Sequence, residues 1–428
     1  MHFPCLFVLL FTKQYATADF CMEKLLHYVW KNRLLPSDAL STTDGKSVVI
    51  KDPGQYNTNQ GPDFINARIE IDGMLWAGDV EIHTNSADWL RHGHHLDPVY
   101  NTTILHVVER ATMEVCCEDG QNVPQVVITV PQSLKDNYHE LLVTTDYPRC
   151  HRFVGTIPQL KVHSWLDSLF VERMQNRAKR ILDILEECCG DWERTTFITL
   201  ARNFGFGLNG DIFEMWAKQI PLFAAGKHRD NLFQIESLFL GQAGLIDKLE
   251  DEQERSRLHS EHRFLSHKFT LPAPMATSHW HYLRIRPQNF PDVRLRQFAR
   301  LFHEGHCSMD SMLGANTVDK LDSRLAEAGM SKGSRNLIII NTVAPLLYAY
   351  DIYHGTQCHR ARATEFLEQL PGENNRILRQ WQECGIKVGT AYDSQALLQL
   401  KKEYCDHVKC PECRFGYEYL SHIARNEG

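Results

Sequence analysis

The sequence predicts an α+β protein in two parts, an N-terminal mixed β-sheet domain followed by a larger all-α domain. Hydrophobic residues make up 43% and charged residues 23% of the 428 residues, a balance typical of soluble chains with two or three domains. Over residues 46–130 hydrophobic positions alternate with period two, as in strands that bury one face. After a proline-containing linker at residues 147–158 the period becomes 3.6, which is typical of helices. We therefore expect domains at residues 22–150 and 151–428.

The first 21 residues are expected to be an extension upstream of the natural start, with a signal peptide as the alternative. The apolar run from Pro4 to Phe11 lacks the positively charged segment of a signal peptide, since only His2 precedes it. Met22 opens a segment typical of an amphipathic helix, whose apolar face carries Leu25, Leu26, Val29 and Trp30. No other stretch approaches the roughly 18 apolar residues of a membrane span, so no membrane partner is expected.

The individual elements follow from the two periods. Gly, Pro and Asn turns separate five expected strands, SVVIKD, NARIEID, MLWAGDVEIHT, NTTILHVVE and QVVITV, with a short helix in SADWLRHG. A long helix is expected from Leu160, where Leu166, Leu169, Phe170, Ile181, Ile184 and Leu185 form an apolar stripe. Further helices are expected in TTFITLARNFGFG, FEMWAKQIPLFAAG, FQIESLFLGQAGLI, LRQFARLFHEG, NLIIINTVAPLLYAYDIYHG and ATEFLEQL.

Charge and cysteine content restrict the class of protein. A formal net charge of −7 argues against a protein that coats nucleic acid by bulk charge, although a local basic face remains compatible with it. The 13 cysteines are spread over a long chain, unlike the dense cysteines of a short secreted scaffold. We therefore expect a cytoplasmic protein, in which most cysteines, Cys150 among them, are ordinary buried thiols.

An acidic cluster is expected in the sheet domain. Pro62-Asp63 opens one predicted strand, and the next strand contains Asp79, Glu81 and His83. Alternation along a strand places these three side chains on one face, and the neighbouring strand can bring Asp63 beside them. Clustered carboxylates repel one another unless a cation lies between them, and hard oxygen ligands favour Mg²⁺ or Mn²⁺. Such a metal can activate water for hydrolysis.

This spacing resembles the PD-(D/E)XK nuclease superfamily, whose signature is Pro-Asp at one strand and Glu-x-Lys on the next. The resemblance implies a restriction-endonuclease-like sheet and metal-dependent cleavage of DNA or RNA. By this resemblance Asp63 and Glu81 bind the metal, Glu23 of the preceding helix adds an acid, and His83 replaces the Lys that polarises water. Because His replaces Lys, two alternatives stay open: a noncatalytic nucleic-acid- or protein-binding module with a degenerate nuclease-like sheet, and another metal hydrolase.

A histidine-rich segment follows, with His92, His94, His95 and Asp97 in a loop and His106 on the next strand. We favour His95, oriented by Asp97, as a metal ligand or proton shuttle. If this group joins Glu81 and His83, a zinc-dependent hydrolase is the competing function. The alternative is a turn at Asp97 with exposed His92 and His94, and a packed His106.

Cysteines near the C-terminus follow a metal-binding spacing, Cys405-x4-Cys410-x2-Cys413. His407 completes a Cys3His zinc site, or else the distant Cys384 or Cys358 completes a four-thiolate site for zinc or an iron–sulfur cluster. Three buried thiols without a metal are the alternative.

Basic residues in the helical part are candidates for nucleic-acid contact. Arg284 and Arg286 lie among aromatic residues, and Lys332 and Arg335 lie in a glycine-containing turn at an expected helix N-terminus, which suits a phosphate. The alternative is that these side chains form salt bridges within the protein.

Several long segments together resemble the bacterial family catalogued as domain of unknown function 2851. The resemblance covers nearly all of residues 22–416 and supports Met22 as the start, but it implies no activity. It rests on MEKLLHYVW, GPDFINARIEIDGMLWAGDVEIHTNSADWLRHGHHLDPVYNTTILHVV, RNFGFGLN, FEMWAKQIP, IESLFLGQAGL, LRIRPQNFPDVRLRQFA and DSQALLQLKKEYCDHVKCPECRFG.

Overall fold

The computed structural model describes residues 22–35 and 40–427, so the expectation for residues 1–21 lies outside the described part. Its contacts divide the chain into two units. One contains the described residues up to Val162 and those from Lys402 onward, and the other contains His163–Lys401. The predicted α+β class is confirmed, with a mixed sheet near the N-terminus and a helical region after it.

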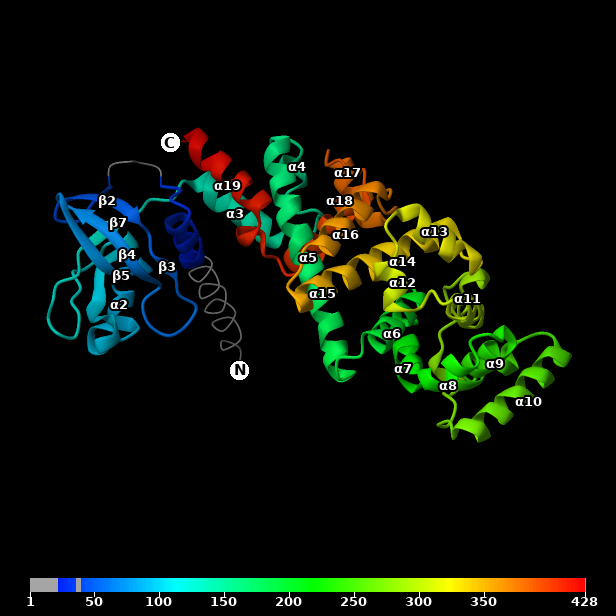
Figure 1. Cartoon of the computed structure of the whole chain (residues 1–428). Coiled ribbons are helices and arrows are strands. Elements are labelled where there is room, and N and C mark those ends of the chain that lie inside the picture. The colour runs from blue at the N-terminus through cyan, green and yellow to red at the C-terminus, as the bar shows by residue number, and fades with distance from the viewer. Residues whose placement is uncertain (1–21, 36–39, 428) are drawn as a thin grey trace, which may run out of the picture. The chain divides into compact units, whose positions relative to one another are not determined.

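The C-terminal segment belongs to the sheet unit, whereas the sequence placed it in the helical domain. Helix α19 (Arg414–Glu427) lies beside α3 (Gln132–Val143), and the two are in contact (Figure 1). Leu420 of α19 is fully buried in the same hydrophobic core as the sheet. Residues His163–Lys401, 239 in all, form the other unit before the chain returns to the first one. Burial of apolar side chains such as Leu420 in the core of the first unit stabilises this return.

Seven strands form one sheet in the order β1-β2-β4-β5-β6-β7, with β3 paired to β4 (Figure 1). The pairs β1–β2, β2–β4, β3–β4 and β4–β5 are antiparallel, whereas β5–β6 and β6–β7 are parallel. The strands are β1 (Leu40–Ser41), β2 (Ser47–Asp52), β3 (Gln55–Tyr56), β4 (Phe64–Ile71), β5 (Met74–Asn85), β6 (Thr103–Arg110) and β7 (Gln125–Val127).

Two connections determine these directions. Asp72 and Gly73 have φ of 50° and 78°, the left-handed conformation that a tight two-residue hairpin turn between β4 and β5 requires. Between β5 and β6 the chain crosses over through α2 (Asp88–Arg91), η1 (His94–Leu96) and η2 (Pro98–Thr102). A crossover of this length permits β6 to run parallel to β5.

The core of the sheet unit contains one sheet face, a helix over residues 22–31, and α3. The predicted apolar face of that first helix is confirmed, because Leu25, Leu26, Val29 and Trp30 are all buried. Val80 and Ile82 of β5 are buried in the same core. Because side chains alternate along a strand, Glu81 and His83 point to the other face.

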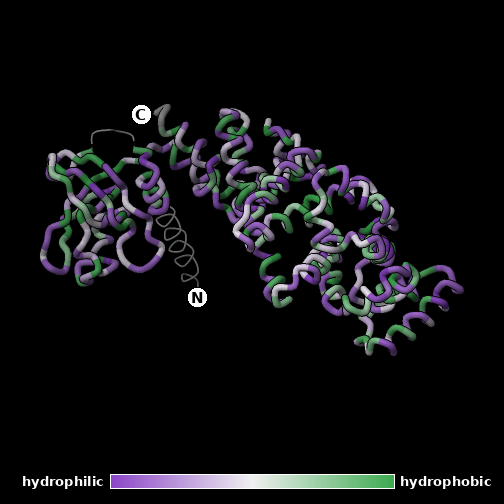
Figure 2. Tube along the Cα trace, in the orientation of Figure 1, coloured by the Kyte–Doolittle hydropathy of each residue, from purple (hydrophilic) through white to green (hydrophobic). Residues whose placement is uncertain are grey.

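The helical unit consists of helices, and its core contains ring contacts among Phe197, Trp216, Phe239 and Phe298. Hydrophobic and hydrophilic residues alternate in short runs along these helices (Figure 2). Among the described helices, none combines the length and apolar composition needed to cross a membrane. The helices are α5 (Gln159–Glu187), α6 (Trp192–Phe204), α7 (Gly210–Gln219), α8 (Leu222–Lys227), α9 (Leu232–Gln242), α10 (Glu252–Phe269), α11 (Pro291–His303), α12 (Met309–Leu313), α13 (Val318–Glu327), α14 (Lys332–Ile338), α15 (Ala344–His354), α16 (Cys358–Gln369), α17 (Arg376–Glu383) and α18 (Ala391–Gln399).

Candidate metal centre

Asp63 and Glu81 are brought together at the start of β4 and the middle of β5. The Glu81 carboxylate accepts a hydrogen bond from the Asp63 backbone N–H at 3.0 Å, and the Asp63 carboxylate accepts one from the Ile82 N–H at 2.9 Å. Asn57 holds the turn before β4, because its side chain donates to the Pro62 carbonyl at 2.9 Å. These bonds fix both predicted acids side by side.

Glu81 lies in an environment that disfavours its charge. Its side chain is 6% exposed, and burial, followed by the neighbouring charge of Asp63, raises the pKa of Glu81 to about 9. Without a counter-charge the Glu81 carboxyl therefore carries a proton at pH 7. A divalent cation between the two acids would remove this penalty, because it would favour the ionised form of both.

His83 is the centre of a histidine cluster behind Glu81. His83 Nδ1 shares a hydrogen bond with His106 Nε2 at 2.9 Å, and His83 Nε2 shares one with His92 Nδ1 at 3.1 Å. Burial, together with the surrounding histidines, lowers the pKa of His83 to about 2, and burial lowers that of His106 to about 3. Both imidazoles are therefore neutral at pH 7, the state in which histidine binds metals.

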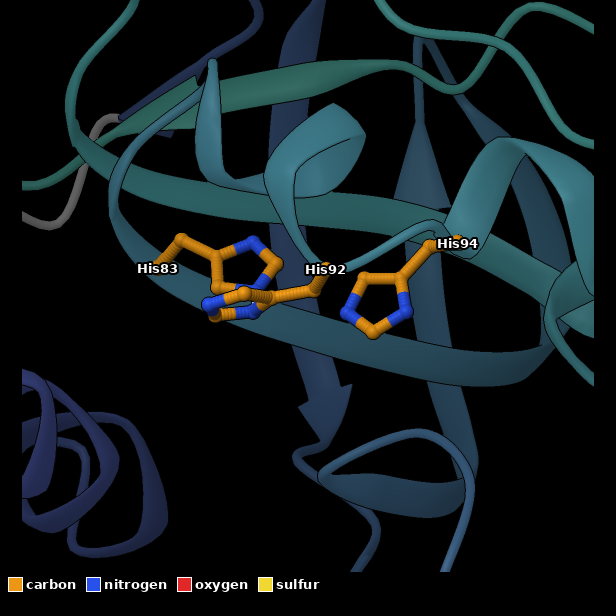
Figure 3. Close-up of side chains that lie close together, drawn as sticks. All are labelled: His83, His92 and His94. Carbon is orange, nitrogen blue, oxygen red and sulfur yellow. The ribbon is translucent and has the colours of Figure 1, made fainter.

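A glycine turn brings His92 and His94 to His83. Gly93 has φ of 80°, so the chain reverses sharply between the end of α2 and the start of η1. His83, His92 and His94 each place a ring nitrogen within 4.8 Å of the others, and their rings lie close together in Figure 3. The structure thus gathers three neutral or weakly basic imidazoles beside a buried carboxylate.

His94 offers the clearest sign that this cluster suits a cation. Its Nε2 lies 3.1 Å from Glu81 Oε1, yet this buried nitrogen has no well-aligned hydrogen-bond partner among the described residues. Burial lowers the pKa of His94, so the ring is not held by a simple ion pair with Glu81. A metal ion would satisfy both the lone pair of His94 and the charge of Glu81, and the donor set of imidazole and carboxylate fits Zn²⁺ or Mn²⁺.

Helix 22–31 adds His27, which the sequence did not single out. His27 Nε2 lies 3.2 Å from Asp63 Oδ2, and Asp63 raises the pKa of His27 although burial, the larger influence, opposes the rise. Glu23 lies one helical turn earlier, and its pKa is raised by burial while His27 opposes the rise. The i, i+4 spacing of Glu23 and His27 was the available signal, since such residues share a helix face.

Other predicted residues have structural partners. Asp79 accepts hydrogen bonds from the Asn66 N–H at 3.0 Å and from the Thr102 hydroxyl at 2.6 Å. Asp97 caps η2 by accepting from the Val99 N–H at 3.0 Å. Neither interaction orients His95, a half-buried residue whose buried Nδ1 has no hydrogen-bond partner among the described residues. Of the loop histidines, the structure therefore brings His94 rather than His95 to Glu81.

The predicted nucleic-acid contacts lie in the helical unit. Arg284 and Arg286 are exposed, as a phosphate contact requires. Arg335 instead donates twice to Asp322, at 2.8 and 3.1 Å, and Lys332 forms an ion pair with the same carboxylate at 2.9 Å. Asp322 thus neutralises the positive charge of the turn at which a phosphate was expected. In addition, α14 has only seven residues, too few for a strong helix dipole at this N-terminus.

Two further clusters lie elsewhere. Asp351, Cys358 and His359 meet in the helical unit, but the Asp351 carboxylate accepts from the backbone N–H groups of His359 and Arg360 and so caps α16. Cys405, Cys410 and Cys413 lie in the C-terminal segment of the sheet unit, where His407 is exposed.

Comparisons with known proteins provide a family and no activity. A family model described as "Protein of unknown function (DUF2851)" matches residues 23–328 and 322–376. No curated protein matches the chain, and no solved structure matches it. The chemistry must therefore be inferred from the arrangement of the side chains.

Proposed function

The chain belongs to the DUF2851 family of proteins of unknown function, as its motifs predicted, and from the site we propose that it is a metal-dependent phosphodiester hydrolase acting on DNA or RNA. The observation that carries this proposal is the convergence of Asp63 and Glu81 on one face of the sheet. A mixed sheet preceded by a helix at residues 22–31, in which β2, β4 and β5 are antiparallel and β6 runs parallel to β5, is compatible with the sheet that the resemblance to nucleases implies.

In this proposal Asp63 and Glu81 hold the cation, with Glu23 close enough to add negative charge. When bound, Mg²⁺ or Mn²⁺ neutralises phosphate charge and makes water more acidic. His27 keeps the Asp63 carboxylate oriented from the side of the helix. The two acids remain in place through backbone hydrogen bonds, so the site is preorganised.

His83 acts differently from the Lys that it replaces in the nuclease signature. A pKa of about 2 keeps His83 neutral, so it cannot supply a positive charge to polarise water. His92 is exposed and burial lowers its pKa, so its neutral ring can accept a proton from water at pH 7. His83, bonded to both His92 and His106, fixes the orientation of the accepting ring.

Cleavage assays test this proposal. The full chain is incubated with single- and double-stranded DNA and RNA in Mg²⁺, in Mn²⁺ and in EDTA, beside Asp63→Asn and Glu81→Gln. Metal-dependent cleavage that both substitutions abolish is expected, and Glu70→Gln, a carboxylate of β4 paired with Lys51 at 2.9 Å, should retain it. Metal binding without cleavage would favour the noncatalytic binding module instead.

A zinc-dependent hydrolase is the second candidate, because His83, His92 and His94 lie within one ligand sphere beside Glu81. Zinc enzymes commonly use three protein ligands and leave one position for water. Elemental analysis of the purified chain separates the two: about one zinc that is lost in His94→Ala, with no activation by Mg²⁺ or Mn²⁺, would support the zinc enzyme.

A further inference from the structure

The C-terminal cysteines lie in a tightly folded turn. Cys405 ends the π-helical turn η7 (Leu400–Cys405), Cys410 begins η8 (Cys410–Glu412), and Cys413 follows directly before α19. The Cys413 N–H donates to the Cys410 carbonyl at 3.2 Å, and the Val408 N–H donates to the Cys405 carbonyl at 3.2 Å. Both bonds fold the backbone into tight turns beside Cys405 and Cys410, as the backbone of a metal-binding knuckle requires.

Gly416 shows how closely this turn is packed against α19. A Cβ atom at Gly416 would lie 2.0 Å from the Cys410 carbonyl oxygen, so only glycine allows helix and turn to approach this closely. Cys410 and Cys413 are 9% and 7% exposed. The turn is therefore a buried, precisely shaped element rather than a loose tail.

Cys150, from a distant part of the chain, lies in the same place. It precedes α4 (His151–Val154), which contacts α19, and it packs against the core that contains Cys410 and Leu420. Burial raises the pKa of the Cys150 thiol well above its usual range, and the nearby thiols of Cys413, Cys405 and Cys410 raise it further. The sequence candidates for this place, Cys358 and Cys384, belong to the helical unit instead.

Burial of Cys150 and Cys410 favours the neutral thiol over the thiolate unless a positive charge lies nearby. Burial and then Cys413 raise the pKa of Cys410 to about 11, whereas Arg149 opposes the rise. Arg149 is held beside Cys150 by donating to the carbonyls of Leu141, Leu142 and Thr144. A bound metal ion, assisted by this guanidinium, would reverse the preference of Cys150 and Cys410 for the neutral form.

We propose that Cys150, Cys405, Cys410 and Cys413 together bind one thiolate-coordinated metal centre, either zinc or an iron–sulfur cluster. Four cysteine ligands are the donor set that both centres take. The centre joins the two chain segments that make up the sheet unit, which are separated in sequence by the whole of His163–Lys401. It would thereby keep α19 in place beside α3 after the chain has returned from the other unit.

Metal and sulfide analysis of the full chain tests the assignment and identifies the centre. A colourless protein with about one zinc per chain at this site indicates zinc, and visible absorption with about four irons and equal sulfide indicates a cluster. Either metal is expected in the wild type, in Cys384→Ser and in His407→Ala, and is lost in Cys150→Ser. Absence of zinc and iron, or a metal content unchanged by Cys150→Ser, would overturn the proposal.

A second measurement does not depend on the folding of a variant. In the wild-type chain the four thiols are expected to resist alkylation until a chelator removes the metal, and then to react as a set. The exposed Cys189 and Cys358 serve as internal controls that react in both conditions. Equal alkylation of Cys150 with and without chelator contradicts the proposal. Glu81→Gln should leave the protection of the cysteines from alkylation unchanged. This result would show that the cysteine centre binds its metal independently of the proposed phosphodiester-cleaving site.

Discussion

The Glu81 carboxylate accepts a hydrogen bond from the backbone N–H of Asp63 at 3.0 Å, which locks the two acids of the candidate site together. Since an amide oxygen also accepts hydrogen bonds, Asp63→Asn preserves the bond from the Ile82 N–H that Asp63 now receives at 2.9 Å. We therefore expect Asp63→Asn to lower metal-dependent cleavage by about 100-fold or more while changing the free energy of unfolding by about 1 kcal/mol or less.

Paired rate and urea-unfolding measurements check this expectation, with Glu70→Gln as the control carboxylate in β4, the strand that begins directly after Asp63. An Asp63→Asn protein that is as stable as the wild type and cleaves at the same rate would show that Asp63 has no catalytic part.

Much of the sheet unit could be predicted because its signals are local. Period-two alternation identified β5, and burial of Val80 and Ile82 agrees with it. The return of α19 to the sheet unit could not be predicted, because it depends on burying Leu420 in a core formed some 260 residues earlier, at residues 22–162. No periodicity within α19 specifies which core receives it.

The candidate metal centre, likewise, could be predicted only where its signals are local. Asp63 and Glu81 follow a spacing that strand alternation converts into proximity, whereas His94 reaches Glu81 only because Gly93 adopts φ of 80°. Sequence alone gives no reason to prefer His94 to the neighbouring His95. Cys150 was passed over because a single cysteine far from the others resembles an ordinary core thiol.

His94 and His95 provide a matched pair for testing metal ligation. We expect His94→Ala to weaken Zn²⁺ or Mn²⁺ binding by roughly 10-fold to 100-fold, because its unpartnered Nε2 lies 3.1 Å from Glu81. His95→Ala should have a smaller effect. Titration calorimetry on both variants, in a Cys150→Ser background that leaves only this site, measures the difference. A larger loss of metal affinity in His95→Ala than in His94→Ala would instead support His95 as the ligand, as predicted from the sequence.

Asp79 should contribute mainly to stability. Its carboxylate accepts from the Asn66 N–H and the Thr102 hydroxyl, so Asp79→Ala leaves two donors without their partner. We expect the free energy of unfolding to fall by about 1–3 kcal/mol, with the cleavage rate per folded molecule reduced far less than in Asp63→Asn. Denaturant unfolding and single-turnover kinetics measure the two quantities. Loss of cleavage without loss of stability would instead place Asp79 in the catalytic group.

The basic residues of the helical unit should divide into two groups. Arg335 is 17% exposed and bonded twice to Asp322, so Arg335→Gln should lower the free energy of unfolding by about 1–3 kcal/mol and leave nucleic-acid affinity unchanged. Exposed Arg284 and Arg286 should behave in the opposite way: their joint replacement by Ala should reduce affinity and lower its salt slope by about 2. Binding isotherms at several salt concentrations test both, and unchanged affinity in the double variant would exclude these arginines from a phosphate contact.

Stability without metal should be greatest near pH 6.5, because the buried groups titrate in opposite directions. His83 and His106 have pKa values lowered to about 2 and about 3 from an ordinary 6.5, so below pH 6.5 the unfolded chain binds protons that the folded chain does not. Each of these two histidines therefore lowers the free energy of unfolding by about 1.4 kcal/mol for every pH unit of acidification. Glu81, with its pKa raised to about 9 from 4.5, keeps a proton in the folded state that the unfolded chain loses, so its contribution declines as pH rises towards 9.

Urea unfolding in EDTA across pH 4 to 9 measures the fall in stability below pH 6.5, the acid limb, and the fall above it, the alkaline limb. A separate variant tests each limb. Glu81→Gln should flatten the alkaline limb, because glutamine does not titrate, and His106→Leu should make the acid limb shallower by about one proton. Wild-type stability that rises steadily from pH 6.5 to 9, or an alkaline limb that persists in Glu81→Gln, would mean that the folded state does not hold Glu81 protonated. In that case the two carboxylates would already be charged before a cation arrives, and metal binding should release no proton from Glu81.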